Sequence, residues 1–141
     1  MRAAPTDSSG VKSMHKSTVL APLDDYFQSV NADSTDRNKK LSGVVDCFTP
    51  DGVIIDQNGV VYNGHDGIRE FYSSASSPVS NIGFTATPDL SSGCCDGAGR
   101  IAVEIILSHP NGTIRVGDFF KFRDGKIEEL HIFSARPVVK R

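Results

Sequence analysis

The sequence changes its hydrophobic period near residues 49–52, and this change is the feature that most restricts the fold. Before it, apolar residues recur every three or four positions, as they do on one face of a helix. After it, several segments alternate with a period of two, which is typical of half-buried strands. Helices followed by a run of strands indicate an α+β fold, with the helices packed on one face of a sheet.

Two amphipathic helices are predicted before this change of period, and a third follows the first strands. Pro22 suits a first helical turn, and residues 22–32 then place apolar side chains on one face. A second helix is expected after Ser34 or Thr35, either of which can cap it. The third helix is predicted within residues 64–76.

A β-hairpin is predicted around Asn58 and Gly59, because an Asn-Gly pair between two β-rich runs is a strong hairpin signal. Thr49 to Gly52 is expected to form the turn before it. Four further strands are expected within residues 81–87, 99–109, 113–123 and 127–135. This order predicts a cone-shaped, curved and mainly antiparallel sheet wrapped around the N-terminal helices.

Length and charge restrict the class of protein further. Lys and Arg number 15 against 17 Asp and Glu, a net charge of −2 that lacks the basic footprint of nucleic-acid binding. No apolar run approaches the ~20 residues that cross a bilayer, and the first residues lack the apolar core of a signal peptide. We therefore expect a flexible tail over residues 1–17 and a single cytoplasmic domain over residues 18–141, without nucleic-acid or membrane partners.

The cysteines and histidines show no metal-ligand spacing. Cys94 and Cys95 are adjacent in an expected loop, and they and Cys47 are interpreted as ordinary reduced thiols. We expect neither a metal ion nor another cofactor.

Asp118 lies on the apolar face of its predicted strand. By alternation it shares that face with Val116 and Phe120, whereas Arg115 lies on the other. A carboxylate in such surroundings is unfavourable as an ion. Asp118 therefore either pairs with another group, or stays protonated and donates a hydrogen bond.

Asp56 directly follows the apolar run Val53-Ile54-Ile55 and precedes the hairpin turn. One interpretation is that its side chain opens the turn, because Asp readily bonds its own backbone. The other is that it is a carboxylate held at the mouth of an apolar cavity. The sequence leaves both open.

The chain resembles the nuclear transport factor 2 superfamily from about Leu23 to Phe133. The segments that carry the resemblance occur in the superfamily's order: YFQSVNA, CFTPDGVIID, YNGHDGIREFY and GDFFKFRDGKIEEL. The resemblance implies the cone-shaped α+β fold. It also implies a relation to ketosteroid isomerases, polyketide cyclases, dehydratases and epoxide hydrolases, which share this frame but differ in chemistry.

The similarity to ketosteroid isomerases implies roles for particular residues. Asp56 would move a proton, Tyr26 and Asp118 would donate hydrogen bonds to the substrate oxygen, and Tyr72 would support Tyr26. Gln57 departs from the isomerase pattern, which usually has Pro there. The expected substrate pocket includes Val116, Phe120, Phe84 and Val103.

Two classes of function remain open. One is an enzyme that moves a proton beside the carbonyl of a small hydrophobic ligand, as an isomerase, cyclase or dehydratase. The alternative is a non-catalytic ligand-binding or dimerisation module. His131 is a rival base, but alternation leaves the face toward which it points ambiguous, and it is better interpreted as a surface or interface residue. Arg115 lies on the strand face opposite Asp118, which argues against an epoxide hydrolase. Exposed Phe119 and Phe133 on the outer sheet face would favour a homodimer.

Overall fold

The computed structural model describes residues 8–33, 35–74, 77–80 and 84–134. Three α-helices, one short 3-10 helix and six strands occur in these residues. In chain order they are α1 (Ser8–Val30), α2 (Arg37–Val45), β1 (Phe48–Ile55), β2 (Val61–Asn63), α3 (Gly64–Ser73), η1 (Pro78–Ser80), β3 (Thr85–Cys95), β4 (Arg100–His109), β5 (Gly112–Arg123) and β6 (Lys126–Ser134).

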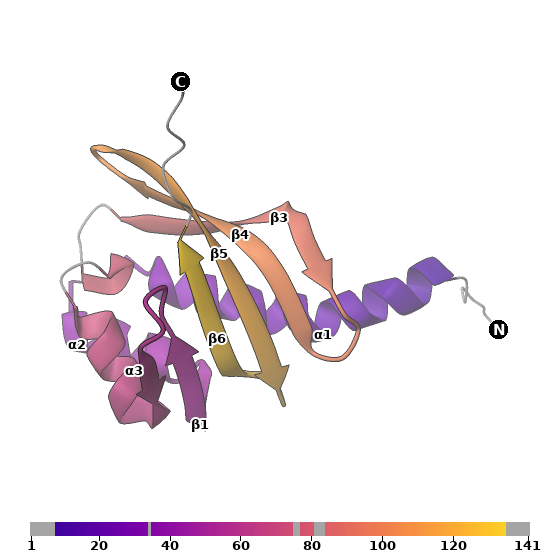
Figure 1. Cartoon of the computed structure of the whole chain (residues 1–141), viewed down its shortest axis with the longest axis horizontal. Coiled ribbons are helices and arrows are strands. Elements are labelled where there is room, and N and C mark those ends of the chain that lie inside the picture. The colour runs from indigo at the N-terminus through magenta and orange to yellow at the C-terminus, as the bar shows by residue number, and fades with distance from the viewer. Residues whose placement is uncertain (1–7, 34, 75–76, 81–83, 135–141) are drawn as a thin grey trace.

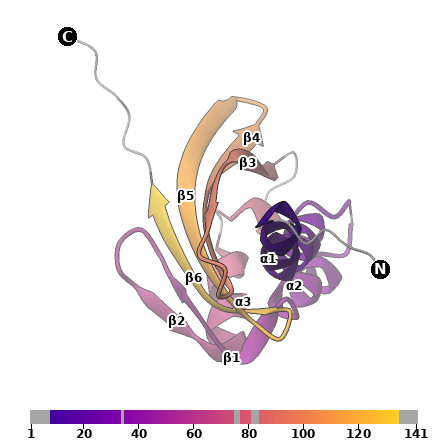
Figure 2. The same cartoon turned by 90° about the vertical axis from the view of Figure 1, so that its right-hand side faces the viewer.

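The strands form one sheet in the order β2-β1-β6-β5-β4-β3 (Figure 1). Neighbouring strands are antiparallel except β1 and β6, which are parallel. Viewed end-on, the sheet curves around the helices (Figure 2). Helix α3 packs on β1 and α1 packs on β3. The predicted α+β fold with a curved, mainly antiparallel sheet is confirmed.

Helix α1 is longer than the sequence pattern predicts. It begins at Ser8, inside the segment expected to be a tail, and Pro22 lies within it rather than in its first turn. The first turns of α1 project beyond the sheet (Figure 1), so no sheet face imposes an apolar period on them. Val19 and Leu23, on either side of Pro22, are each only 1% exposed. Their burial holds the helix against the core where the proline removes a backbone donor.

The N-terminus of α2 uses a different cap from those expected. The carboxylate of Asp36 accepts a hydrogen bond from the backbone N–H of Lys39 at 3.1 Å. Thr35 is therefore not the cap, and Ser34 lies outside the described residues. Asp is as favourable at this position as Ser and more favourable than Thr, so N-cap preference did not exclude Asp36.

The predicted turn from Thr49 to Gly52 is instead part of β1, which begins at Phe48. The pairing of β1 with β6 is irregular between Phe48 and Val53. A Cβ atom at Gly52 would lie 3.0 Å from the carbonyl oxygen of Thr49, so the local bend requires glycine. The turn-forming residues thus coincide with an irregular stretch within a strand.

Cys94 and Cys95 also lie in a strand, at the end of β3, where they pair with Ala102 and Ile101 of β4. The loop-like composition around them coincides with an irregular register between Asp89 and Cys94. All three cysteines of the chain are free.

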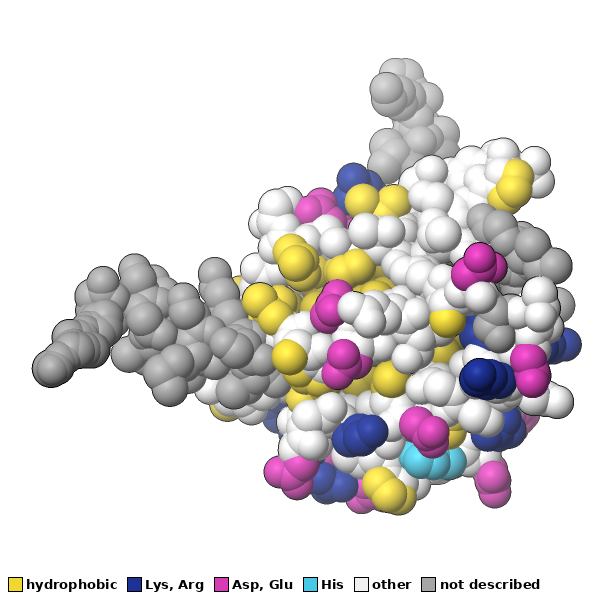
Figure 3. Space-filling view, turned by 180° about the vertical axis from the view of Figure 1, so that it is seen from behind, with side chains coloured by type: hydrophobic (Ala, Val, Ile, Leu, Met, Phe, Trp, Pro, Cys, Tyr) yellow, Lys and Arg dark blue, Asp and Glu magenta, His cyan; other side chains and the backbone are white. Residues whose placement is uncertain are grey.

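The core lies between the helices and the inner face of the sheet. Its largest fully buried side chains include Phe48, Leu23, Ile54, Ile68 and Ile105. Seen from behind, acidic and basic side chains are interspersed over the surface (Figure 3). None of the helices in the described ranges is both long and apolar enough to cross a membrane.

Candidate functional site

A cavity of about 430 Å³ opens between the helices and the inner face of the sheet. This volume is in the range of pockets that enclose small organic molecules. Tyr26 and Phe27 of α1 and Tyr72 of α3 line one side. The other side is formed mainly by aliphatic residues of the strands: Ile105, Leu107, Ile114, Val116 and Ile132.

Asp118 of β5 lines this cavity and is only 6% exposed. The alternation of the strand turns it inward with the buried Phe120. Its Oδ1 atom is buried and has no hydrogen-bond partner among the described residues. Burial raises the pKa of this carboxyl to about 7. Of the two states left open by the sequence, the unpaired carboxyl that can hold its proton is therefore the one present.

Tyr26 and Tyr72 meet inside the cavity through their hydroxyl groups, which hydrogen-bond to each other. The rings are 5% and 2% exposed, respectively. Burial, and secondarily the nearby Asp118, raises the pKa of Tyr26, and burial raises that of Tyr72 well above its ordinary value. Both hydroxyls therefore keep their protons at neutral pH. If Tyr72 donates to Tyr26, the proton of Tyr26 is free to bind a ligand oxygen.

Asp56 lies at the end of β1, lines the cavity and is 9% exposed. Its Oδ1 atom accepts hydrogen bonds from the backbone N–H groups of Asn58 and Val60, at 2.8 and 2.9 Å. Gly59 closes the turn with a φ of 80°. Within the described part of the chain, Oδ2 receives no hydrogen bond. One carboxylate oxygen is thus anchored by the turn and the other is available for a ligand.

The structure thus places the four expected functional residues around one cavity: Tyr26, Tyr72, Asp56 and Asp118. Of the four residues expected to form the substrate pocket, only Val116 lines this cavity. The other three do not line the cavity. The ring of Phe120 is enclosed by other aromatic rings, among them those of Tyr26 and Phe27. Val103 is buried opposite Asp118 in the register of β4 and β5, and Phe84 packs on the ring of His109.

Several cavity residues were missed by sequence reasoning. Ile105 and Leu107 alternate along β4, and Ile132 pairs with Asp118 from β6. The alternation of side chains along each strand indicates that these residues face inward. Only the register between strands shows that they line the same wall as Asp118. Gln57 and Asn58 line the opening because the hairpin turn itself lies there.

His131 and Arg115 lie away from the cavity. His131 pairs with Phe119 in the sheet, and its ring packs on Phe133 on the outer face. Phe119 and Phe133 are 54% and 45% exposed, with ring centroids 5.0 Å apart. Arg115 is exposed and forms ion pairs with acidic residues of β3 and β4. The surface interpretation of His131 and the outward parity of Arg115 are confirmed.

Comparison with known proteins agrees with this architecture. A family model described as SnoaL-like domain matches residues 23–130. The chain belongs to the SnoaL-like domain family. No curated protein matches its sequence.

Within the described residues, no group of three or more His, Cys, Asp or Glu side chains is placed to hold a metal ion.

Solved structures with this fold include proteins with different names. A protein of Kribbella flavida, named as a candidate ketosteroid isomerase, has a TM-score of 0.66 at 15% identity, over 89% of this chain and 83% of that one. An NTF-2 like protein of unknown function from Burkholderia xenovorans has a TM-score of 0.66 at 15% identity, over 91% of both chains. A candidate polyketide cyclase of Sinorhizobium meliloti has a TM-score of 0.60 at 23% identity, over 79% and 93%. The resemblance to the nuclear transport factor 2 superfamily is confirmed, and these likenesses concern the fold alone.

Proposed function

We propose that this SnoaL-like protein is an enzyme that moves a proton next to the carbonyl group of a small hydrophobic ligand. Asp56 is the general base. Tyr26 and Asp118 donate hydrogen bonds to the carbonyl oxygen, and Tyr72 supports Tyr26. Isomerisation of a β,γ-unsaturated ketone is the simplest such reaction, and a cyclase or dehydratase could use the same groups.

The observation that carries this proposal is the unpartnered, buried Oδ1 of Asp118 in a cavity that also contains Tyr26 and Asp56. A buried polar atom without a partner destabilises a fold by ~1–3 kcal/mol. A protein that only needed a stable core could fill this position with an apolar residue. A ligand oxygen would supply the missing partner.

The reaction requires no cofactor to balance. Asp56 takes a proton from the carbon beside the carbonyl, and the electron pair of the broken C–H bond forms an enolate with negative charge on the oxygen. Tyr26 and protonated Asp118 stabilise that oxygen by donation. Asp56 then returns the proton to a carbon further along the conjugated system. The double bond has moved, and the enzyme is unchanged.

The protonation state of Asp118 gives the proposal a pH dependence. Because the pKa of Asp118 is about 7, the donor form is lost as the pH rises above this value. The ratio kcat/KM, which reports the free enzyme, should therefore decline above about pH 7. The variant Asp118→Asn keeps a donor at every pH and should not show this decline.

The test is a screen of β,γ-unsaturated ketones, with formation of the conjugated ketone followed by ultraviolet absorbance. Asp56→Asn should lose ~10²-fold or more in kcat, because the amide cannot accept the proton. Asp33→Asn changes an exposed carboxyl outside the cavity and serves as the matched control. A ketone turned over equally fast by wild type and Asp56→Asn would overturn the role of the base.

A second candidate function is ligand binding without catalysis. It is favoured by the two backbone bonds to Oδ1 of Asp56, which are what a purely structural turn residue would make. On this alternative the ketones bind but are not converted. Isothermal titration of the same ketones, alongside the absorbance assay, separates the two candidates.

A further inference from the structure

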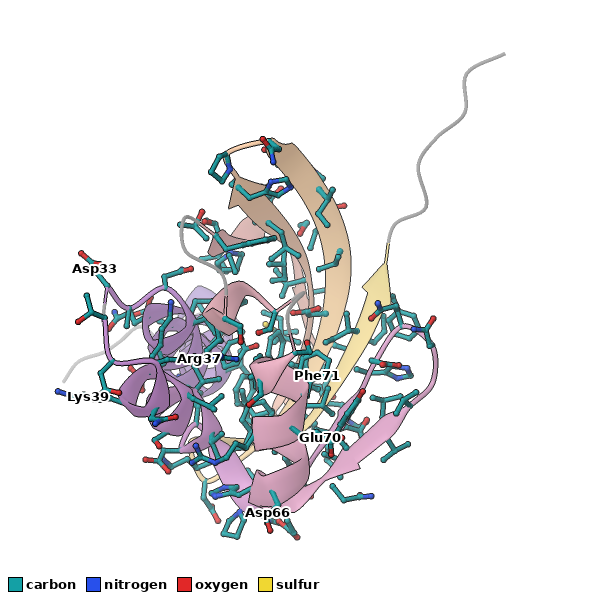
Figure 4. All side chains as sticks on the ribbon, turned by 90° about the vertical axis from the view of Figure 1, so that its left-hand side faces the viewer. Asp33, Arg37, Lys39, Asp66, Glu70 and Phe71 are labelled. Atoms are coloured by element: carbon teal, nitrogen blue, oxygen red, sulfur yellow. The ribbon has the colours of Figure 1, made fainter. Side chains whose placement is uncertain are left out.

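The C-terminal end of α3 is held by residues from two other elements. The carbonyl oxygen of Ser73 accepts a hydrogen bond from Nη2 of Arg37, in α2, at 2.9 Å. The same Nη2 donates to Oγ of Ser80, in η1, at 3.1 Å. Ser80 Oγ in turn donates to the carbonyl oxygen of Tyr72 at 2.7 Å. Figure 4 shows Arg37 reaching from α2 toward this end of α3.

This arrangement supplies what α3 lacks in its own sequence. The last carbonyls of a helix have no partner within the helix, and a positive charge near them is favourable. The last turn of α3 contains no basic residue. Arg37 therefore acts as the cationic cap of a helix to which it does not belong.

The capped turn is part of the cavity. It contains Tyr72, whose hydroxyl bonds to Tyr26. The partner of Arg37 in η1 is close to cavity residues as well, because Ser77 lines the cavity and its carbonyl accepts from the N–H of Ser80 at 3.0 Å. One guanidinium thus connects the last turn of α3, which carries Tyr72, with the adjoining wall of the cavity.

We propose that Arg37 is a positioning residue for the Tyr26–Tyr72 pair. It touches no substrate and acts by fixing the end of α3. Loss of its two hydrogen bonds lets the last turn fray, and the hydroxyl of Tyr72 then no longer holds Tyr26 in one orientation. The effect on turnover rests on the proposed function, whereas the effect on the tyrosine pair does not.

The variants Arg37→Gln and Arg37→Lys test the proposal in the full-length protein. Gln removes the charge and shortens the reach, whereas Lys keeps the charge and can restore part of the contact. Lys39→Gln is the matched control, because it makes the same charge change from an exposed position on the same helix. In Figure 4 Lys39 points away from α3.

The first readout needs no ligand. With ¹³C-labelled tyrosine, the Cζ resonances of Tyr26 and Tyr72 report the environment of the two hydroxyls. Arg37→Gln should shift both resonances, Arg37→Lys should shift them less, and Lys39→Gln should leave them unchanged. Unchanged resonances in Arg37→Gln would overturn the proposal, whatever happens to activity.

The second readout uses a ketone that the absorbance screen identifies. Arg37→Gln should lower kcat by roughly tenfold and change KM little, since misplacement of a donor affects the transition state most. A change confined to KM would contradict the positioning role. If no ketone is turned over, the tyrosine resonances still decide the proposal while the proposed function fails separately.

A further variant guards against misfolding of Arg37→Gln. Ser80→Ala keeps the guanidinium and removes only the link from Arg37 to the carbonyl of Tyr72. It should move the tyrosine resonances in the same direction by a smaller amount. Resonances identical to those of wild type in both Ser80→Ala and Arg37→Lys would count against the proposal.

Discussion

Asp118→Asn should make the stability of the protein less sensitive to a rise in pH from about 4 to 7, because it removes a buried carboxyl that has no partner. In the folded protein the pKa of Asp118 is about 7, compared with an ordinary value of 3.8 for the same group in an unfolded chain. Between these values the folded state holds a proton that the unfolded state has released. Stability therefore falls as the pH rises through this window and is constant above it.

The magnitude follows from the difference between the two pKa values. Each pH unit within the window costs ~1.4 kcal/mol. From about pH 5 to pH 7 the free energy of unfolding of wild type should therefore fall by about 2 kcal/mol relative to that of Asp118→Asn, because the carboxyl is already half ionised at pH 7. Contributions from other titrating groups cancel in this comparison. Above about pH 8 the difference should no longer change, because the carboxyl is then ionised in both states.

The assay is urea unfolding at a series of pH values, followed by circular dichroism because the chain contains no Trp. Asp33→Asn is the control, since its side chain projects into solvent (Figure 4) and should follow wild type throughout. A stability difference between Asp118→Asn and wild type that does not change with pH would refute the reasoning. A pKa near 4 for Asp118 in an NMR titration of the free protein would do the same.

Three further predictions concern other parts of the molecule. Asp56→Ala should lower the free energy of unfolding by ~1 kcal/mol more than Asp56→Asn, because only Asn can still accept the two backbone hydrogen bonds of the turn; urea unfolding measures this. Gly67→Ala should destabilise by ~1–3 kcal/mol, although Ala usually favours a helix, because the new Cβ would lie 3.0 Å from the backbone of Tyr62; a raised melting temperature would be inconsistent with this packing. We also propose a homodimer through the outer sheet face, so Phe119→Asp should yield a monomer in light scattering, and an already monomeric wild type at micromolar concentration would exclude it.

The fold was predictable from sequence because its signals are local. The period of two and the Asn58-Gly59 pair specify the hairpin of β1 and β2, and alternation alone turned Asp118 inward. The errors arose where one local signal has two structural outcomes. Thr49 to Gly52 reads as a turn but forms an irregular part of β1, and Pro22 suits a helix start but lies inside α1. Which of the two outcomes occurs depends on how the flanking residues are buried, and burial is a property of the tertiary structure.

The site was predictable only in part. The sequence pattern singled out Asp56 and Asp118, the resemblance added Tyr26 and the roles of all three, and all three line the cavity. Phe84, Val103 and Phe120 were misplaced, because the register between strands determines which inward residues border an open space and which fill the core. Arg37 carried no recognisable pattern, since its partners are backbone and hydroxyl oxygens more than 30 residues away in the sequence.

The order of strands in the sheet has a consequence for folding during synthesis. Strand β6 lies between β1, which Asp56 directly follows, and β5, which contains Asp118. These two strands do not pair with each other, and the strand that joins them is the last of the described strands to be synthesised. A nascent chain that has reached residue 125 thus contains both carboxylates but cannot hold them across one cavity. Until β6 emerges from the ribosome, the facing edges of β1 and β5 lack their native partner and are open to pairing with other chains.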